Sequence, residues 1–275
     1  MDNKISTLSR ALVLDNQMSL AVLDTTALVG EAAKRHRLKE GSLQVLGNTL
    51  TASAYLCSWL KGPNSSLAIS LHTDGDFGKV SVLGDGNLNL RGYVENTAVE
   101  QGKLGDGTLS VVRDDRTGLP FVGTVPLVSE QIDENFAAYF SESEQIHTGV
   151  ALCVLTGGGK PVRAGGVILQ ALPFADESVR LQIPSKTALL KEFLMAGELD
   201  KIWGEFGVQK TETREVKFAC TCSKARVESL LLSMGKEQAT ALCEEDGQIS
   251  VHCEYCNTDY IFLQDKVREL FKKHE

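Results

Sequence analysis

The first part of the chain has a hydrophobic pattern that predicts two strands followed by two helices. Short apolar runs at residues 12–14 and 20–23 are split by Asp15-Asn16-Gln17, which is typical of a hairpin or two neighbouring strands. Asp24-Thr25-Thr26 offers capping side chains for a helix that we expect to reach about His36. A second helix is predicted at residues 39–60, where apolar side chains recur at helical spacing. These are Leu43, Leu46, Leu50, Ala54 and Cys57.

From residue 67 the pattern becomes that of strands separated by tight turns. Strands are predicted at residues 67–71, 79–83, 88–94 and 108–112. The turns between them contain glycine and aspartate, at residues 74–76, 84–86 and 105–107. None of these turns opens a helix with the Gly-Lys-Ser/Thr sequence of a nucleotide P-loop, so we expect a meandering sheet and no nucleotide site.

One more helix and two more strands complete the predicted core. Residues 129–140 have a polar first turn and an apolar face that includes Phe136 and Phe140, which favours a helix. Strands at residues 150–155 and 162–172 are joined across Gly157-Gly158-Gly159. A mixed sheet with flanking helices indicates an α/β (α+β) core domain, which we place at residues 1–180.

After Pro173 apolar residues become sparse on a polar background, which predicts a helical linker at residues 181–217. Its expected helices cover residues 185–199 and 201–203, and its apolar stripe must pack against other parts of the protein, because helices of this length are marginal alone in water. Interspersed charged residues leave little surplus stability, so we expect the linker to be metastable. A small domain at residues 218–275 follows and ends in an amphipathic helix at residues 264–271.

Composition and charge narrow the class of protein. The 275 residues are 43% hydrophobic and 23% charged, which excludes collagen-like and wholly disordered chains. The net charge of -8 has the wrong sign for binding nucleic acid or an anionic membrane surface. No apolar run approaches the length of a membrane span, and residues 1–6 lack the pattern of a secretory signal, so we expect a cytoplasmic protein.

The seven cysteines are unevenly distributed. Cys57 and Cys153 stand alone in apolar surroundings, which predicts buried structural thiols without a chemical role. The others lie in the last quarter of the chain. An odd number of cysteines in a chain expected to stay in a reducing compartment argues against a permanent disulfide framework, so metal binding is the first hypothesis.

Two close pairs of cysteines, Cys220 with Cys222 and Cys253 with Cys256, have the spacing of a structural zinc site. Zn²⁺ takes four ligands at tetrahedral corners, and each short spacer lets one tight turn supply two thiolates. The sequence predicts one zinc ion per chain in the reduced protein. Four thiolates leave no position for an activated water, so we predict no catalytic residues. Cys243 and His252 are alternative ligands, although His252 adjoins Cys253 and would point away from its metal.

The same cysteines have the properties of a redox switch. Zinc-bound thiolates are open to oxidation by peroxide or hypochlorous acid, and each disulfide removes two ligands from the metal. A disulfide within Cys220-Thr221-Cys222 would close a small, strained ring, which makes it readily reversible. Because a small metal domain owes most of its folding free energy to the metal, oxidation should unfold it.

Several motifs resemble the heat-shock protein 33 family of redox-regulated holdase chaperones. Residues 218–223, 244–249, 252–257 and 260–262 are similar to the family's zinc domain in order and spacing. Residues 139–148 and 164–173 are similar to its core domain. The resemblance covers nearly the whole chain. It implies a protein that, under oxidative stress, loses zinc, forms disulfides, unfolds its linker, dimerises and binds unfolding proteins without ATP.

Residue by residue, Cys220, Cys222, Cys253 and Cys256 match the family's metal ligands and redox-active cysteines. The resemblance implies disulfides between near neighbours in each pair, and the lower entropy cost of closing short loops favours the same pairing. Two departures stand out. The family commonly has Arg-Glu-Arg where this chain has Lys224-Ala225-Arg226, and Cys243 is an additional thiol that could compete in disulfide formation.

Two other functions share parts of this pattern. A thiol-disulfide oxidoreductase could use Cys253-Glu254-Tyr255-Cys256, but it would need a thioredoxin-like βαβ unit, which is not evident in the sequence. A static zinc-binding interaction module would have the same metal site but would gain no binding on oxidation. For a holdase we expect the client surface among exposed apolar stripes of the linker and core.

Overall fold

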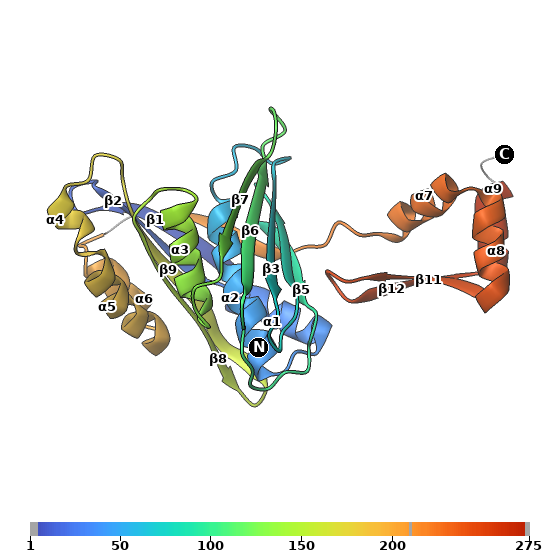
Figure 1. Ribbon diagram of the computed structural model, residues 1–275, viewed down its shortest axis with the longest axis horizontal. Helices are drawn as coiled ribbons and strands as arrows, with labels where there is room; N and C mark the ends of the chain where they lie inside the picture. Colours follow the sequence, from blue (N-terminus) through green and yellow to red (C-terminus); the bar gives the residue numbers. More distant parts are fainter. Residues whose placement is uncertain (1–4, 209–210, 273–275) are drawn as a thin grey trace. The chain divides into compact units, whose positions relative to one another are not determined.

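The computed structural model (Figure 1) describes residues 5–208 and 211–272 of the chain. The chain divides into two compact units, the first ending at Ala219 and the second beginning at Cys220. None of the helices in these described ranges has the length and apolar character that crossing a membrane requires.

The first unit is built on one mixed sheet, which has ten strands within the described residues, in the order β7-β6-β3-β4-β5-β10-β1-β2-β9-β8. Neighbouring strands are antiparallel except for β5 and β10, which are parallel. The strands are β1 (Ser6–Val13), β2 (Met18–Asp24), β3 (Ser66–Thr73), β4 (Val80–Asp85), β5 (Asn89–Val94), β6 (Gly107–Asp114), β7 (Phe121–Pro126), β8 (Thr148–Gly157), β9 (Lys160–Ala171) and β10 (Glu212–Phe218).

Two groups of helices cover opposite faces of one half of this sheet (Figure 1). Ala21 and Leu23 of β2 join the core beneath α1 (Thr26–His36), α2 (Glu40–Cys57) and α3 (Ile132–Glu142). The alternate residues Leu20 and Val22 join a separate core with α5 (Ile183–Ala196) and α6 (Leu199–Gly204), which follow the short α4 (Glu177–Arg180). Because β2 and residues 164–171 of β9 are buried on both faces, their sequences are mostly apolar.

The second unit is small. It contains α7 (Lys224–Met234), α8 (Lys236–Asp246), α9 (Gln264–Lys272) and an antiparallel hairpin of β11 (Gln248–Cys253) and β12 (Thr258–Leu263). Its buried apolar side chains, apart from the thiol of Cys256, form one cluster. They are Val227, Leu231, Ala239, Cys243, Ile249, Phe262, Val267 and Phe271.

The structure confirms the predicted fold class, a mixed α/β core followed by a small cysteine-containing unit. The predicted strands and helices of residues 5–172 are present, and α5, α6 and α9 confirm the helices predicted in the linker and at the C-terminal end. The linker predicted at residues 181–217 is not helical in its last part, where β10 forms a strand that the sequence did not predict. Strand β7, helices α7 and α8 and the β11–β12 hairpin were not predicted.

Candidate metal centre

The second cysteine pair lies in the turn of the β11–β12 hairpin. Cys253 ends β11, and its carbonyl oxygen accepts hydrogen bonds from the backbone N–H groups of Cys256, at 3.2 Å, and Asn257, at 2.8 Å. Asn257 has a φ of 54°, the left-handed conformation that asparagine tolerates better than most residues. This tight turn places the two thiols on the same side of the hairpin end.

The first cysteine pair lies between β10 and α7. Ser223 directly follows Cys222 and is the N-cap of α7, where its Oγ accepts a hydrogen bond from the backbone N–H of Arg226 at 3.2 Å. The side chain of Arg226 also donates to Thr221 Oγ1 at 3.4 Å. The helix cap therefore fixes the backbone immediately after the two thiols and keeps a cationic side chain beside them.

The four sulfur atoms meet in one place. The Sγ atoms of Cys220, Cys222, Cys253 and Cys256 all lie within 4.8 Å of one another. Cys220 Sγ is 3.8 Å from Cys253 Sγ, and Cys222 Sγ is 3.2 Å from Cys256 Sγ. A tetrahedron with Zn–S bonds of about 2.3 Å has sulfur–sulfur edges of about 3.8 Å. The side chains therefore fit a four-thiolate zinc site without rearrangement of the backbone.

Hydrogen bonds and burial affect the thiols of this cluster unequally. Burial raises the pKa of Cys222, but hydrogen bonds from Tyr260 and the neighbouring thiols outweigh it and lower the pKa to about 7. The Tyr260 hydroxyl donates to Cys222 Sγ at 3.2 Å. Burial and hydrogen bonds to other thiols raise the pKa of Cys220, and burial is the main cause of the raised pKa of Cys256. Among these three thiols, Cys222 is therefore the one whose surroundings most favour the thiolate.

Comparisons with known proteins identify the family of this chain. The model of the family described as Hsp33 protein matches residues 6–263. The chain belongs to the Hsp33 family. Relatives named 33 kDa chaperonin are 35% identical in Bacillus cytotoxicus and 36% identical in Bacillus cereus, each aligned over 96% of this chain and 98% of the relative. The crystal structure of the 33 kDa chaperonin from Thermotoga maritima has a TM-score of 0.84 and 28% identity, covering 99% of this chain and all of that one.

The two alternative ligands predicted from the sequence of this Hsp33 protein lie outside the sulfur cluster. His252 and Asp259 face each other across β11 and β12, with 2.7 Å between His252 Nδ1 and Asp259 Oδ1. Cys243 is fully buried in the apolar cluster of the second unit. His252 therefore pairs with a carboxylate and Cys243 packs as a small apolar side chain.

Cys57 and Cys153 are buried in the first unit, as predicted. Burial raises the pKa of both thiols, to about 11 for Cys153 and further for Cys57. Cys57 belongs to the core beneath α1, α2 and α3, whereas Cys153 belongs to the core covered by α5 and α6. Neither thiol is available to the cluster in the second unit.

Tyr260, Thr258 and Arg226 are part of this site, but the sequence did not identify them. Thr258 Oγ1 lies 3.3 Å from Cys256 Sγ. Thr258 and Tyr260 are two residues apart on β12, so both side chains lie on the same face of the hairpin as the thiols. Prediction of β12 as a strand would have identified Thr258 and Tyr260. The hydrogen bond from Arg226 to Thr221 forms only because Ser223 caps α7, so no sequence pattern signals it directly.

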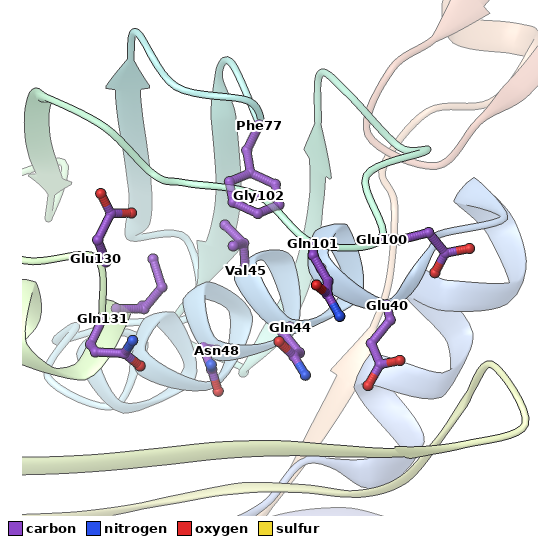
Figure 2. A pocket seen from close by; sticks show the side chains of 12 residues that line it. Glu40, Gln44, Val45, Asn48, Phe77, Glu100, Gln101, Gly102, Glu130 and Gln131 are labelled. Carbon is purple, nitrogen blue, oxygen red and sulfur yellow. The ribbon is translucent and has the colours of Figure 1, made fainter.

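A separate polar hollow of about 350 Å³ lies in the first unit, and Figure 2 shows side chains that line it. Gln44 and Asn48 of α2, with Gln101 and Gln131 from loops, supply carboxamides to its lining. A hydrogen bond from Lys39 lowers the pKa of Glu100, a lining carboxylate that pairs with this lysine at 2.9 Å. Glu100 is therefore held in its ionised form, which makes it a poor general acid at neutral pH.

Proposed function

We propose that this Hsp33-family chain is an ATP-independent holdase whose binding of unfolding client proteins is switched on by oxidation. The observation that carries the proposal is the meeting of four thiols, from two turns far apart in sequence, within 4.8 Å. We propose Cys220, Cys222, Cys253 and Cys256 as ligands of one Zn²⁺ in the reduced chain and as the redox-active cysteines. When bound, zinc would hold these groups as thiolates in a closed site, without catalysis.

Oxidation removes the ligands in pairs. Two thiols lose two electrons and two protons as their S–S bond forms, and hydrogen peroxide takes up both and is reduced to water. The closeness of all four sulfur atoms lets any of the pairings begin within the cluster. We propose near-neighbour disulfides, between Cys220 and Cys222 and between Cys253 and Cys256, because these close the shortest loops.

Loss of the ligand set should unfold the second unit. Its apolar cluster contains few large side chains, and a domain this small rarely folds without a metal or disulfides that fix its native turns. The proposed zinc domain, residues 218–275, would follow the proposed linker, residues 181–217, and the core, residues 1–180. Unfolding it would release the restraint on the C-terminal end of the linker.

The linker helices cover apolar surface of the core. Leu190 and Leu194 of α5 and Ile202 of α6 pack on one face of the sheet with Met18, Leu20 and Val167. Lys191 of α5 pairs at 2.6 Å with Asp133, whose side chain is only 8% exposed. Release of α5 and α6 would therefore expose a continuous apolar face, which could bind clients or a second chain, and we propose that the oxidised protein dimerises.

Aggregation of a thermally unfolding client tests the proposal. Peroxide-treated protein without ATP should suppress light scattering, and reduced zinc-loaded protein should not. Equal suppression by both forms would favour a static zinc-binding module. Catalytic turnover of a disulfide substrate would favour a thiol-disulfide oxidoreductase, whereas we propose that the protein is not an enzyme. We place its activity in the cytoplasm, where reducing conditions keep the resting thiols free, with no role for nucleic acid or membranes.

Replacing Tyr260 by phenylalanine is expected to weaken zinc binding about 10-fold or more. The change removes the hydrogen bond to Cys222 Sγ, and outer partners of metal ligands typically contribute 10- to 100-fold in affinity. Competition with a chromophoric zinc chelator measures the effect. Ile261→Val changes an exposed side chain on the other face of β12, so it is the control and should bind zinc as the parent does.

Cys153 and Cys57 form an internal pair of reporters for linker release. Removing α5 and α6 should return water to Cys153, whose pKa of about 11 reflects burial, and its alkylation at pH 8 should rise about 100-fold. Cys57 lies in the other core and should stay unreactive. Mass spectrometry of iodoacetamide-treated protein measures both. Equal protection of the two thiols after zinc loss would contradict release of the linker.

A further inference from the structure

Strand β10 occupies an unusual position, because it comes from the C-terminal end of the first unit yet lies between β5 and β1 in the middle of the sheet. We propose that this place in the sheet, the β1–β5 slot, is the site that binds clients, as extended segments of unfolded polypeptide. The inference rests on the proposed holdase function and names the surface and the form of its ligand.

Main-chain hydrogen bonds hold β10 on both sides. Along β1 the pairing is antiparallel, from Ser6 opposite Val216 to Arg10 opposite Glu212. Along β5 it is parallel, and the backbone N–H groups of Lys217 and Ala219 donate to the carbonyls of Leu88, at 2.9 Å, and Leu90, at 2.8 Å. Any extended segment without proline at these positions can make such bonds, which suits a partner of no fixed sequence.

Few side chains of β10 are buried, although Arg214 donates a hydrogen bond to the carbonyl of Gly86. Val216 is its one buried residue, at 3% exposure, and Phe218 is partly buried, with the Arg35 guanidinium 5.1 Å from its ring centroid. Glu212, Thr213, Glu215 and Lys217 are exposed. A central strand is usually apolar on at least one face, so β10 is weakly held for its position and belongs to the least stable part of the sheet.

The chain connects β10 directly to the metal centre. Phe218 ends the strand, and Cys220 is the first thiol of the cluster, so no flexible spacer separates them in sequence. While the second unit is folded, its first residues have a fixed conformation. Unfolding of that unit converts them into free chain, whose added conformational freedom favours departure of a strand with one buried side chain.

A hollow of about 400 Å³ lies beside β10 and offers apolar surface to a client. Ile5, Ala27, Leu28 and Phe218 line it together with polar residues that include Glu31, Glu215 and Lys217. The side chains of β10 leave this hollow unfilled, so a client segment with a larger apolar side chain there would bury additional apolar surface. The β10 strand of a second copy would repeat the same weak contacts, which makes strand exchange between copies the less favourable occupant.

The β1–β5 slot also offers a client more main-chain pairing than the outer strands of the sheet do. A segment added beside β7 or β8, the two end strands, would pair along one edge. A segment in the β1–β5 slot pairs along two edges and has a hollow with both apolar and polar lining beside it. Because main-chain pairing supplies most of the affinity of an added strand, the slot should bind unfolded chains more tightly than either edge.

Site-specific photo-crosslinking in the full-length protein tests the inference. Ser9 of β1 faces Thr213 of β10, with their hydroxyls 2.8 Å apart, and Ser110 faces Thr124 of β7 in a matching pair at 2.9 Å. A benzophenone amino acid replaces Ser9 in one variant and Ser110 in the other. In reduced protein, position 9 should cross-link residues 211–218 of its own chain. After peroxide treatment with thermally unfolding citrate synthase, position 9 should cross-link the client several-fold more than position 110 does.

Light scattering from the same samples distinguishes failure of the inference about the β1–β5 slot from failure of the proposed holdase function. If oxidised protein suppresses aggregation while position 9 still cross-links its own residues 211–218, the inference is overturned and the holdase function stands. Cross-linking of position 9 to those residues in a second chain also overturns it, in favour of strand exchange. If oxidised protein neither suppresses aggregation nor cross-links client, the proposed function and the inference fall together.

A variant of β10 provides a second test that does not depend on the benzophenone group. Val216→Ala removes most of the strand's one buried side chain, so reduced protein should already suppress aggregation in part and reach full suppression at a several-fold lower dose of peroxide. Glu215→Ala changes an exposed neighbour on the same strand and should behave as the parent. Identical dose responses of the two variants would overturn the inference.

Discussion

Purified reduced protein with Cys253→Ser is expected to lose most of its zinc, whereas the parent should contain about one ion per chain. Cys253 supplies one of four sulfur atoms that lie within 4.8 Å, and a serine hydroxyl does not ionise at neutral pH to replace it. Structural zinc binds with about 10 to 16 kcal/mol, so each thiolate accounts for about 3 kcal/mol and the affinity should fall at least about 100-fold. Metal analysis and chelator competition measure the loss.

Cys243→Ala is the matched control in the same unit. This thiol is fully buried among apolar side chains and lies outside the sulfur cluster, so its removal should cost about 1 kcal/mol of stability and leave the zinc content unchanged. Because Cys253→Ser should also unfold the second unit, far-UV circular dichroism should show that the first unit stays folded. Loss of zinc from the Cys243 variant, with zinc retained after Cys253→Ser, would disprove the ligand assignment.

The sequence predicted those strands and helices whose buried positions carry apolar side chains. Helices cover β2 and residues 164–171 of β9 on both faces, and the apolar runs of these segments identify them. β10 was not predicted because Glu212, Glu215 and Lys217 interrupt any apolar pattern along it. Main-chain hydrogen bonds to β1 and β5 hold this strand in the sheet. A strand of that kind is specified by the partners that the rest of the chain provides, which a local pattern does not show.

The ligands of the candidate metal site could be predicted from the sequence, but the residues around them could not. The two cysteine pairs follow from spacing alone, because a tight turn delivers both thiols of a pair to one metal, and the structure brings the four sulfurs together. The surroundings of the thiols do not follow from spacing. Tyr260 reaches Cys222 because the turn at Asn257 folds β12 back along β11. Arg226 reaches Thr221 because Ser223 caps the helix between them.

Hydrogen exchange after oxidation is expected to rise sharply in residues 181–217 and to stay slow in the strands β2, β8 and β9. The linker helices pack on the sheet through Leu190, Leu194 and Ile202, with many of their other side chains exposed. The free energy gained by burying their apolar side chains is opposed by an ordering cost of about 1 to 2 kcal/mol per residue. The net free energy that holds these helices on the sheet is therefore small. Loss of about 3 kcal/mol of local stability corresponds to about 100-fold faster amide exchange.

Peptide-level mass spectrometry resolves the linker from the core, and Trp203 gives an independent signal. Trp203 is partly buried against the same face of the sheet, so release of α6 should shift its fluorescence to the red. The exchange of α2 serves as the internal control, since this helix belongs to the other core and is buried along most of its length. Faster exchange in α2 as well would indicate global unfolding. Unchanged protection of residues 181–217 after zinc release would contradict the linker mechanism, even in a protein that suppresses aggregation, because clients would then bind without exposure of the surface beneath α5 and α6.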